Sequence, residues 1–197
     1  MKRFLIILQV LFLAITLNAR QPERGYRGFL DWSNSLCSEK IAVFAPGPGL
    51  NVIGYSRENY LLTGASTSHG YQINSRFFVG AGIGIEHNQR WGSWIAPLFA
   101  YGRMDLQFGK LTPYADMRLG WDLTEEGGIY FSPSIGYRFN WGRKLGINVG
   151  AGLTLIDYKY YEYGFIPESV SGYNTMYLKG SCHKAKPYFS FRVGIDF

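Results

Sequence analysis

Hydrophobic and polar residues alternate at every second position over several long stretches of this chain. Between Phe77 and Glu86, every second residue is apolar, whereas the intervening positions are mainly glycine. The same alternation occupies residues 144–155 and the last ten residues, 188–197. Because successive side chains of a β-strand point to opposite faces, this period of two predicts strands that each have one apolar face.

Weaker alternation in five further segments brings the number of expected strands to eight. The five segments are residues 26–35, 61–73, 94–107, 111–121 and 128–139. Most of the eight segments contain 9 to 14 residues. Strands of soluble domains have roughly 5–6 residues, and a tilted strand needs roughly 9–11 to cross a bilayer. These lengths favour a barrel that spans a membrane, and no segment after residue 19 has an extended helical pattern.

The polar face of the predicted strands combines small residues with charges of both signs. In a soluble ligand-binding barrel, the apolar face would line the interior and the outward face would be charged. Small residues and opposite charges instead suit a narrow lumen, and the apolar face must then meet lipid. We therefore expect an all-β protein, a single eight-stranded antiparallel up-and-down transmembrane β-barrel over residues 20–197. A soluble ligand-binding barrel is the alternative.

Eight charged residues on the predicted polar face form the candidate lumen site. Each buried arginine needs a nearby carboxylate, because an unpaired charge in such a space is costly. We expect a structural ion-pair network, and a small ion-conducting pore is the alternative. The candidates are Glu86, Arg103, Asp105, Asp116, Arg118, Arg138, Arg192 and Asp196.

Short and long connections alternate along the chain. Tight-turn compositions occur at residues 74–75, 108–110 and 140–143. The other connections are longer and comprise residues 37–58, 87–92, 122–127 and 158–186. Because membrane barrels have short periplasmic turns and longer outer loops, this alternation places both termini in the periplasm.

The first nineteen residues have the organisation of a secretory signal peptide. Lys2 and Arg3 precede an apolar stretch of 14 residues, Phe4 to Leu17, and Ala19 ends a plausible cleavage site. The apolar stretch is shorter than the roughly 20 residues of a membrane-spanning helix. We expect cleavage after residue 19 and delivery of the remaining chain to the cell outer membrane.

Composition narrows the possible functions. The chain of 197 residues is 47% hydrophobic and 17% charged, which excludes a disordered protein. Its net charge of +6 is spread along the chain without clusters of Lys and Arg, so we expect no nucleic-acid partner. The sequence has no phosphate-binding loop, nucleotide motif or metal-ligand cluster, and we expect no cofactor and no metal.

Three histidines, His69, His87 and His183, are the candidates for acid–base catalysis. The expected topology places His69 near the periplasmic end and the other two in outer loops. No serine, histidine and carboxylate therefore share one strand face near the outer leaflet. We expect no enzymatic activity, although the adjacent Glu86 and His87 leave a lipid-A-modifying enzyme as an alternative.

Cys37 and Cys182 lie near opposite ends of the expected barrel domain. The first and last strands of a closed barrel are neighbours, so the loops that carry the two cysteines should emerge side by side. An oxidising compartment would allow the thiols to pair. We therefore predict a disulfide between Cys37 and Cys182.

The last long connection is rich in aromatic residues, in residues 157–165 and at Tyr173, Tyr177 and Tyr188. Tyrosine rings favour the headgroup zone of a membrane, so we interpret them first as an interfacial girdle. A protruding hairpin that binds a surface partner is the alternative.

Several segments together resemble the small outer-membrane barrels of Gram-negative bacteria, the OmpA- and OmpX-like barrels of the porin family. They are residues 25–31, residues 66–72 and the terminal strand that ends in Phe197, all behind a signal peptide. The resemblance covers nearly all of residues 25–197. It implies an integral outer-membrane protein that is a structural envelope protein, an adhesin or a small pore.

The resemblance also implies partners besides outer-membrane lipid. An extracellular partner would bind at the loops, and the barrel assembly machinery would act during insertion. The terminal strand is similar to the signal that this machinery recognises, formed here by Phe189, Phe191, Val193, Ile195 and Phe197. The departure from the pattern is proline, because Pro97, Pro113 and Pro133 fall inside expected strands, where each removes a hydrogen-bond donor.

Overall fold

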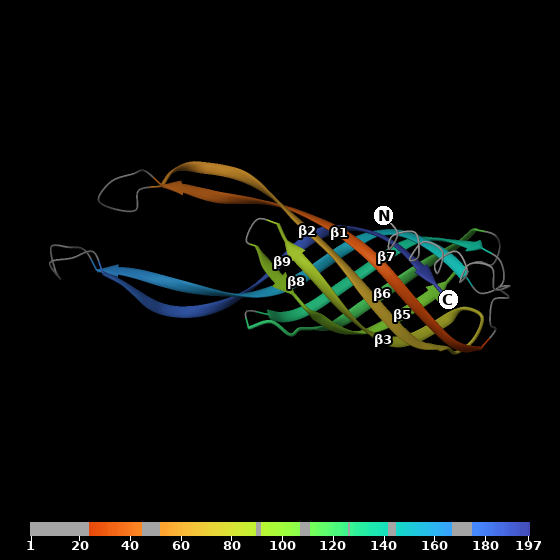
Figure 1. Ribbon diagram of the computed structural model, residues 1–197. Coiled ribbons are helices and arrows are strands. Elements are labelled where there is room, and N and C mark those ends of the chain that lie inside the picture. The colour runs from red at the N-terminus through yellow and green to blue at the C-terminus, as the bar shows by residue number, and fades with distance from the viewer. Residues whose placement is uncertain are drawn as a thin grey trace, which may run out of the picture.

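The computed structural model describes residues 24–44, 52–89, 92–106, 111–125, 127–141, 145–166 and 175–197. The strands in these ranges form one sheet that closes into a barrel (Figure 1). They are β1 (Gly25–Phe44), β2 (Val52–Gln72), β3 (Phe77–Asn88), β4 (Ser93–Ile95), β5 (Pro97–Asp105), β6 (Leu111–Asp122), β7 (Gly127–Trp141), β8 (Leu145–Ile166) and β9 (Thr175–Asp196). The short β4 and β5 pair with β3 in one continuous register, so the ring has eight members.

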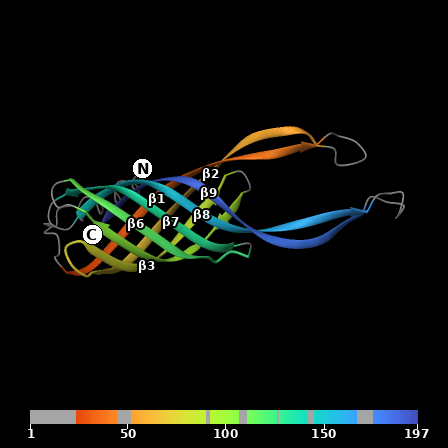
Figure 2. The same cartoon turned by 180° about the vertical axis from the view of Figure 1, so that it is seen from behind.

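The first and last strands close the ring. β1 pairs with β2 on one side and with β9 on the other, and β2 also pairs with β3. All neighbouring strands are antiparallel, and Figures 1 and 2 show the wall from opposite sides. The expected all-β fold, an eight-stranded antiparallel up-and-down barrel, is confirmed. None of the described residues forms a helix long and apolar enough to cross a membrane, and the expected signal peptide, residues 1–19, lies outside the described residues.

The register of the strands fixes the tilt of the barrel wall. Following paired residues once around the ring from Gly25 leads back to Ser35, ten positions further along β1. The path passes through Gln72, Phe78, Arg103, Asp116, Ser134, Gly152 and Ser190. A stagger of this size in eight strands requires a tilt of about 40° and leaves a lumen that side chains can fill.

Two β-hairpins extend well beyond the ring (Figures 1 and 2). The pairing of β1 with β9 ends at Leu36, but β1 continues to Phe44 beside β2, and β9 begins at Thr175 beside β8. The two longest loops expected from the sequence are therefore mostly strand, which corrects that prediction. Charges at consecutive positions, such as Glu39 and Lys40, interrupt the alternation while the backbone pairing continues.

The three prolines are accommodated within the wall in different ways. Pro97 follows a break between β4 and β5, where the Asp122 carboxylate accepts a 2.8 Å hydrogen bond from the preceding backbone N–H. Pro133 interrupts the β7–β8 ladder, and the neighbouring Ser132 hydroxyl donates to a β8 carbonyl at 3.3 Å. Pro113 lies within β6. At Pro133 a side-chain hydroxyl thus supplies a donor to β8, whereas at Pro97 a side-chain carboxylate accepts from the backbone N–H next to the proline.

The two faces of the wall have opposite character. Apolar side chains point outward, and Leu30 is 50% and Ile135 70% exposed. Polar side chains point into the lumen, where Arg118 is 2% and Asp105 1% exposed. This arrangement inverts the usual distribution of a soluble domain, and it buries apolar surface only if lipid surrounds the barrel.

Candidate functional site in the lumen and at the hairpin bases

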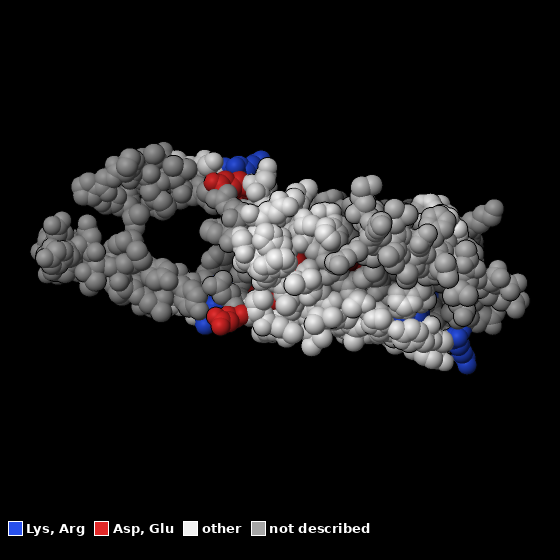
Figure 3. All heavy atoms as spheres, viewed as in Figure 1, with Lys and Arg blue, Asp and Glu red and all other residues white. Residues whose placement is uncertain are grey.

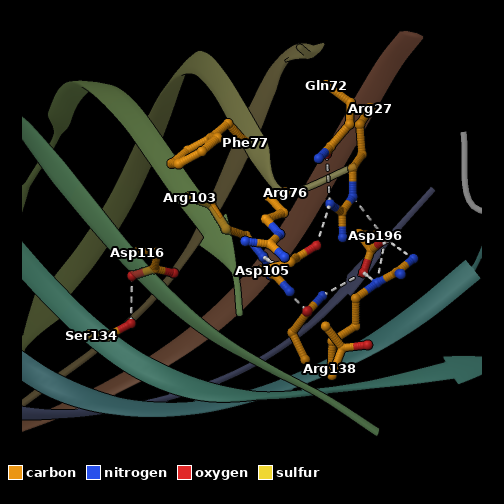
Figure 4. A network of polar contacts seen from close by, with 12 residues as sticks. Arg27, Gln72, Arg76, Phe77, Arg103, Asp105, Asp116, Ser134, Arg138 and Asp196 are labelled. Carbon is orange, nitrogen blue, oxygen red and sulfur yellow. Dashed lines mark hydrogen bonds and ion pairs between the residues drawn. The ribbon is translucent and has the colours of Figure 1, made fainter. Parts of the chain in front are cut away.

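Three arginines and two aspartates form a network at the end of the lumen nearest the short turns (Figure 4). Asp196 of β9 accepts hydrogen bonds from Arg138 of β7 at 2.6 Å and from Arg27 of β1 at 3.1 Å. Asp105 of β5 accepts from Arg103 at 2.8 Å and lies 3.4 Å from Arg27. All five side chains are at most 5% exposed. The network joins β1, β5, β7 and β9 across the lumen.

Two amide side chains extend this network. Asn148 of β8 donates to Asp196 at 2.8 Å, and its side-chain oxygen accepts from Arg103 at 2.8 Å. Gln72 of β2 accepts from Arg27 at 2.9 Å. Buried charges of both signs are thereby paired and hydrogen-bonded, and this pairing offsets much of the cost of removing them from water.

Glycine makes room for the network. Gly146 of β8 faces the lumen, and a β-carbon at this position would lie 2.4 Å from both Arg138 Nε and Asp196 Oδ1. A β-carbon at Gly194 would lie 2.0 Å from an oxygen of Asp31. No side chain fits at such separations in a packed interior. These glycines are therefore required by the charged side chains that lie against them.

Two further ion pairs cross the lumen between the network and the hairpin end. Arg118 of β6 pairs with Asp31 of β1 at 2.5 Å, and Arg192 of β9 pairs with Asp116 of β6 at 3.3 Å. Asp116 also accepts a hydrogen bond from the Tyr101 hydroxyl at 3.1 Å. The four ion-paired side chains are at most 7% exposed, so the middle of the lumen is also filled.

Aromatic rings pack among these charges. Phe29 contacts Phe78 and Tyr101 edge-on, with 5.0 Å and 5.2 Å between ring centroids. Phe99 stacks on Tyr130 with 5.9 Å between centroids. The five rings are at most 3% exposed. Small and charged residues were expected on the inward face, so this aromatic packing was not predicted from the sequence.

The hairpin end of the lumen is closed mainly by apolar side chains. Tyr60, Leu62, Ile95, Ile156 and Tyr188 belong to one cluster, and each is at most 2% exposed. Together with the two layers of charge and the aromatic rings, this cluster fills the lumen along its length. Such packing disfavours a continuous path for water.

The eight candidate lumen residues all lie inside the barrel, and seven of them take part in ion pairs. Glu86 is 5% exposed and accepts a 3.4 Å hydrogen bond from Tyr130, but it joins no ion pair among the described residues. Arg27 and Asp31 were not predicted from the sequence, yet they take part in three of the six lumen ion pairs of the described residues. Both residues lie on the strand face opposite to that of the apolar Leu30, and this alternation could have identified them.

An ion pair joins the two hairpins beyond the ring. Glu39 of β1 accepts a 2.7 Å hydrogen bond from Lys186 of β9 and lies 3.6 Å from Lys184. Burial alone would raise the pKa of the Glu39 carboxyl. The hydrogen bond and the positive charge of Lys186 outweigh burial and hold this pKa below its ordinary value of 4.5. Side-chain charges thus connect the hairpin bases where the backbone pairing of β1 with β9 has ended.

The expected disulfide is not formed, because Cys37 and Cys182 are both free. In the ring Leu36 pairs with Phe189, so Cys37 lies near the start of its hairpin. Cys182 lies much further along the other hairpin, opposite Tyr160. The offset of six residues corresponds to about 20 Å of strand, far beyond the roughly 4.4–6.8 Å between the Cα atoms of a disulfide. β1 and β9, which carry the two cysteines, are neighbours, but the two thiols lie at different distances from the ring.

The three histidines occupy outward positions on three different strands. His69 of β2 contacts the Tyr26 hydroxyl at 2.5 Å, and His87 of β3 packs against Trp94. His183 of β9 lies 3.0 Å from Asp157 on the β8–β9 hairpin. Within the described part of the chain, no group of three His, Cys, Asp or Glu side chains could hold a metal ion.

Four of the five residues of the expected assembly signal lie along the outward face of β9, and the fifth, Phe197, directly follows this strand. Phe189 is 57% and Phe197 46% exposed, whereas Ile195 is half-buried. Two backbone hydrogen bonds, of 2.9 and 3.0 Å, join Phe197 to Gly28 of β1. The terminal residue therefore belongs to the seam that closes the ring.

Comparison with known proteins identifies no family for this chain. No family model matches it, and no curated protein matches it. One similar solved structure is the solid-state NMR structure of outer membrane protein AlkL in DMPC lipid bilayers. It shares 16% sequence identity with a TM-score of 0.36, and the match covers 85% of this chain and 89% of that chain. Similarity at this level establishes neither a shared family nor a shared function.

Proposed function

We propose that this chain is an integral outer-membrane β-barrel protein without enzymatic activity that acts at the cell surface through its two protruding hairpins. The observation that carries the proposal is a barrel filled by its own side chains and extended on one side by two long hairpins (Figures 1 and 2). A filled lumen leaves little space for a substrate or solute. The surfaces available for function therefore lie outside the barrel.

The outward face supports insertion into a membrane. Leu30, Ile83 and Leu119, on three different strands, are each about half exposed. A protein that presented a continuous apolar surface of this kind to water would aggregate, whereas lipid covers it at no cost. Because membrane barrels keep their short turns on the periplasmic side, the hairpins would face the cell exterior.

The hairpins offer strand edges to a partner. Beyond Leu36, β1 pairs with β2 alone among the described residues, and before Phe189, β9 pairs with β8 alone. The second edge of each strand thus carries backbone donors and acceptors that no described strand uses. Open edges of this kind accept an extended segment from another protein. This geometry supports a surface-interaction role over a purely structural one.

A deletion experiment tests the surface role. Residues 159–181 would be replaced by a tight turn, and adhesion of cells that display the variant would be compared with adhesion of wild-type cells. We expect adhesion to be lost while the variant barrel still folds. The matched control replaces the short β6–β7 connection, residues 123–126, at the same end of the barrel and should leave adhesion intact. Unchanged adhesion after the hairpin deletion would contradict the proposed role.

A small ion-conducting pore is the second candidate. The observation that favours it is the presence of five buried arginines in the lumen, Arg27, Arg103, Arg118, Arg138 and Arg192. Each of them is paired with a carboxylate, however, and the apolar cluster closes the hairpin end. We therefore rank this function below the surface role.

A further inference from the structure

Two basic residues lie directly opposite each other on the outward face of the β1–β2 hairpin. Leu36 pairs with Leu61 at the edge of the apolar band, and four positions further from the ring Lys40 pairs with Arg57. Residues four apart on a strand share a face, so Lys40 and Arg57 point to the same side as the two leucines. Both basic side chains are exposed.

The β8–β9 hairpin repeats this spacing. Leu155 pairs with Pro187, and four positions further Lys159 pairs with His183. Here a carboxylate is present, because Asp157 lies 3.0 Å from His183. Figure 3 shows charged side chains gathered where each hairpin leaves the barrel. Each hairpin thus carries a basic pair four positions beyond an apolar pair, but only the second has its own carboxylate partner among the described residues.

The inner face of the β1–β2 hairpin also carries a pair of like charges, and opposite charges of the other hairpin compensate it. Glu39 and Glu58 pair directly across the hairpin, and Lys184 and Lys186 of the other hairpin bind Glu39 from the opposite side of the gap. Like charges placed directly opposite each other destabilise a strand pair unless an opposite charge compensates them. Among the described residues the outward basic pair has no such compensation, since none of their carboxylates forms an ion pair with Lys40 or Arg57.

The distance of Lys40 and Arg57 from the apolar band indicates which negatively charged group lies close enough to compensate them. Four residues of strand span about 13 Å, or about 10 Å along the axis of a barrel tilted by about 40°. Long basic side chains at that height reach back toward the lipid headgroups. We propose that Lys40 and Arg57 form a binding site for the phosphate of an outer-leaflet lipid headgroup. The guanidinium would bind two phosphate oxygens, and the ammonium would add a third contact. This site rests on the proposed membrane insertion.

Solution NMR of the full barrel in zwitterionic micelles tests the site. The side-chain N–H signals of Arg57 and the backbone signals of Lys40 would be followed while dihexanoyl phosphatidic acid is added. We expect saturable shifts at both residues. The double variant Lys40→Gln/Arg57→Gln should bind roughly 25-fold more weakly, about fivefold for each basic residue removed. The matched control Lys184→Gln, which removes a lysine that faces the gap, should bind as the wild type does.

The same titration separates the sources of phosphate. Inorganic phosphate should bind far more weakly than the lipid, and equal binding of both would overturn the assignment to a lipid headgroup. Equal affinity of the double variant and the wild type would overturn the site itself. Each variant is first checked for a compact band on an unboiled denaturing gel. A wild-type protein without that band would overturn the proposed function, which is a separate failure.

Discussion

Single carboxylates hold the lumen together, and Asp196 is the clearest case because it binds both Arg27 and Arg138. Asp196→Asn would replace the carboxylate that two buried guanidiniums share with a neutral amide. Among the described residues, Arg27 would keep only Asp105, at 3.4 Å, and Arg138 would keep no ion pair. We expect a loss of about 3–5 kcal/mol in the free energy of unfolding, measured by urea titration in lipid vesicles. The control Asp157→Asn removes a partly exposed partner of His183 and should cost less than about 1 kcal/mol. Equal effects of both substitutions would contradict the importance of the network.

The stability effect of replacing a lumen glycine can be compared with that of replacing a glycine outside the lumen. Gly146→Ala would place a β-carbon 2.4 Å from Arg138 Nε. Overpacking of this kind costs about 1–3 kcal/mol. A β-carbon at Gly102 of β5 meets nothing within 4 Å, so Gly102→Ala should leave the free energy of unfolding unchanged or slightly increased. Unfolding of both variants in the same vesicles would measure the difference, and similar stabilities would argue against a packed lumen.

The period of two predicted which way most residues point but not which residues meet. Arg103 and Asp105 were both expected in the lumen, yet the partners of Asp196 come from strands distant in the sequence. Those contacts depend on the stagger of the ring, and a stagger cannot be obtained from one strand at a time. Phe29 and Phe99 were missed for another reason, since an aromatic residue is compatible with either face of a strand.

At the scale of elements, the hairpins were the part least predictable from the sequence. Strand pairing continues through Glu39 and Lys40 because neighbouring strands hydrogen-bond through the backbone whatever their side chains are. The alternation that identified the wall disappears where both faces meet water. In the wall, lipid on one face and a packed lumen on the other impose alternation on every strand. The number and order of the wall strands were therefore predicted correctly.

The two cysteines give a prediction about the hairpins. Burial raises the pKa of the Cys37 thiol, and that side chain is half-buried, whereas Cys182 is exposed. A maleimide reagent at pH 7 should therefore modify Cys182 faster than Cys37, because the thiolate is the reactive form. Mass spectrometry of the reaction at successive times would measure both rates. Two thiols that resist the reagent until a reductant is added would instead indicate the disulfide.

The contact between the hairpin bases should depend on pH. The Glu39 carboxyl has a pKa below 4.5 in the folded protein because of Lys186. The contribution of the Glu39–Lys186 ion pair to the free energy of unfolding is therefore complete above pH 4.5. It is lost as the pH falls through the lowered pKa of Glu39. An NMR titration of the Glu39 carboxyl carbon should show a higher pKa in Lys186→Gln than in the wild type. The same pKa in both proteins would contradict the ion pair.

At the scale of the whole molecule, a filled lumen predicts an electrically silent barrel. Planar-bilayer recordings of the wild type should show no steady conductance, because packed side chains block a continuous water path. Arg138→Ala should also remain silent, since the apolar cluster at the hairpin end is untouched by this change. Regular conductance steps in the wild type would favour the pore over the surface role.

The closed barrel and its lipid-facing wall are the features on which both the surface role and the lipid site depend. Closed barrels resist detergent until heated, because every strand of the ring is paired on both sides and no edge is left to open. The most direct measurement is therefore a denaturing gel of isolated outer membranes, run with and without boiling. We expect recovery in the outer-membrane fraction and a mobility that changes on heating. Recovery in the soluble periplasm with no change in mobility would mean that the apolar face does not meet lipid, and would contradict the account.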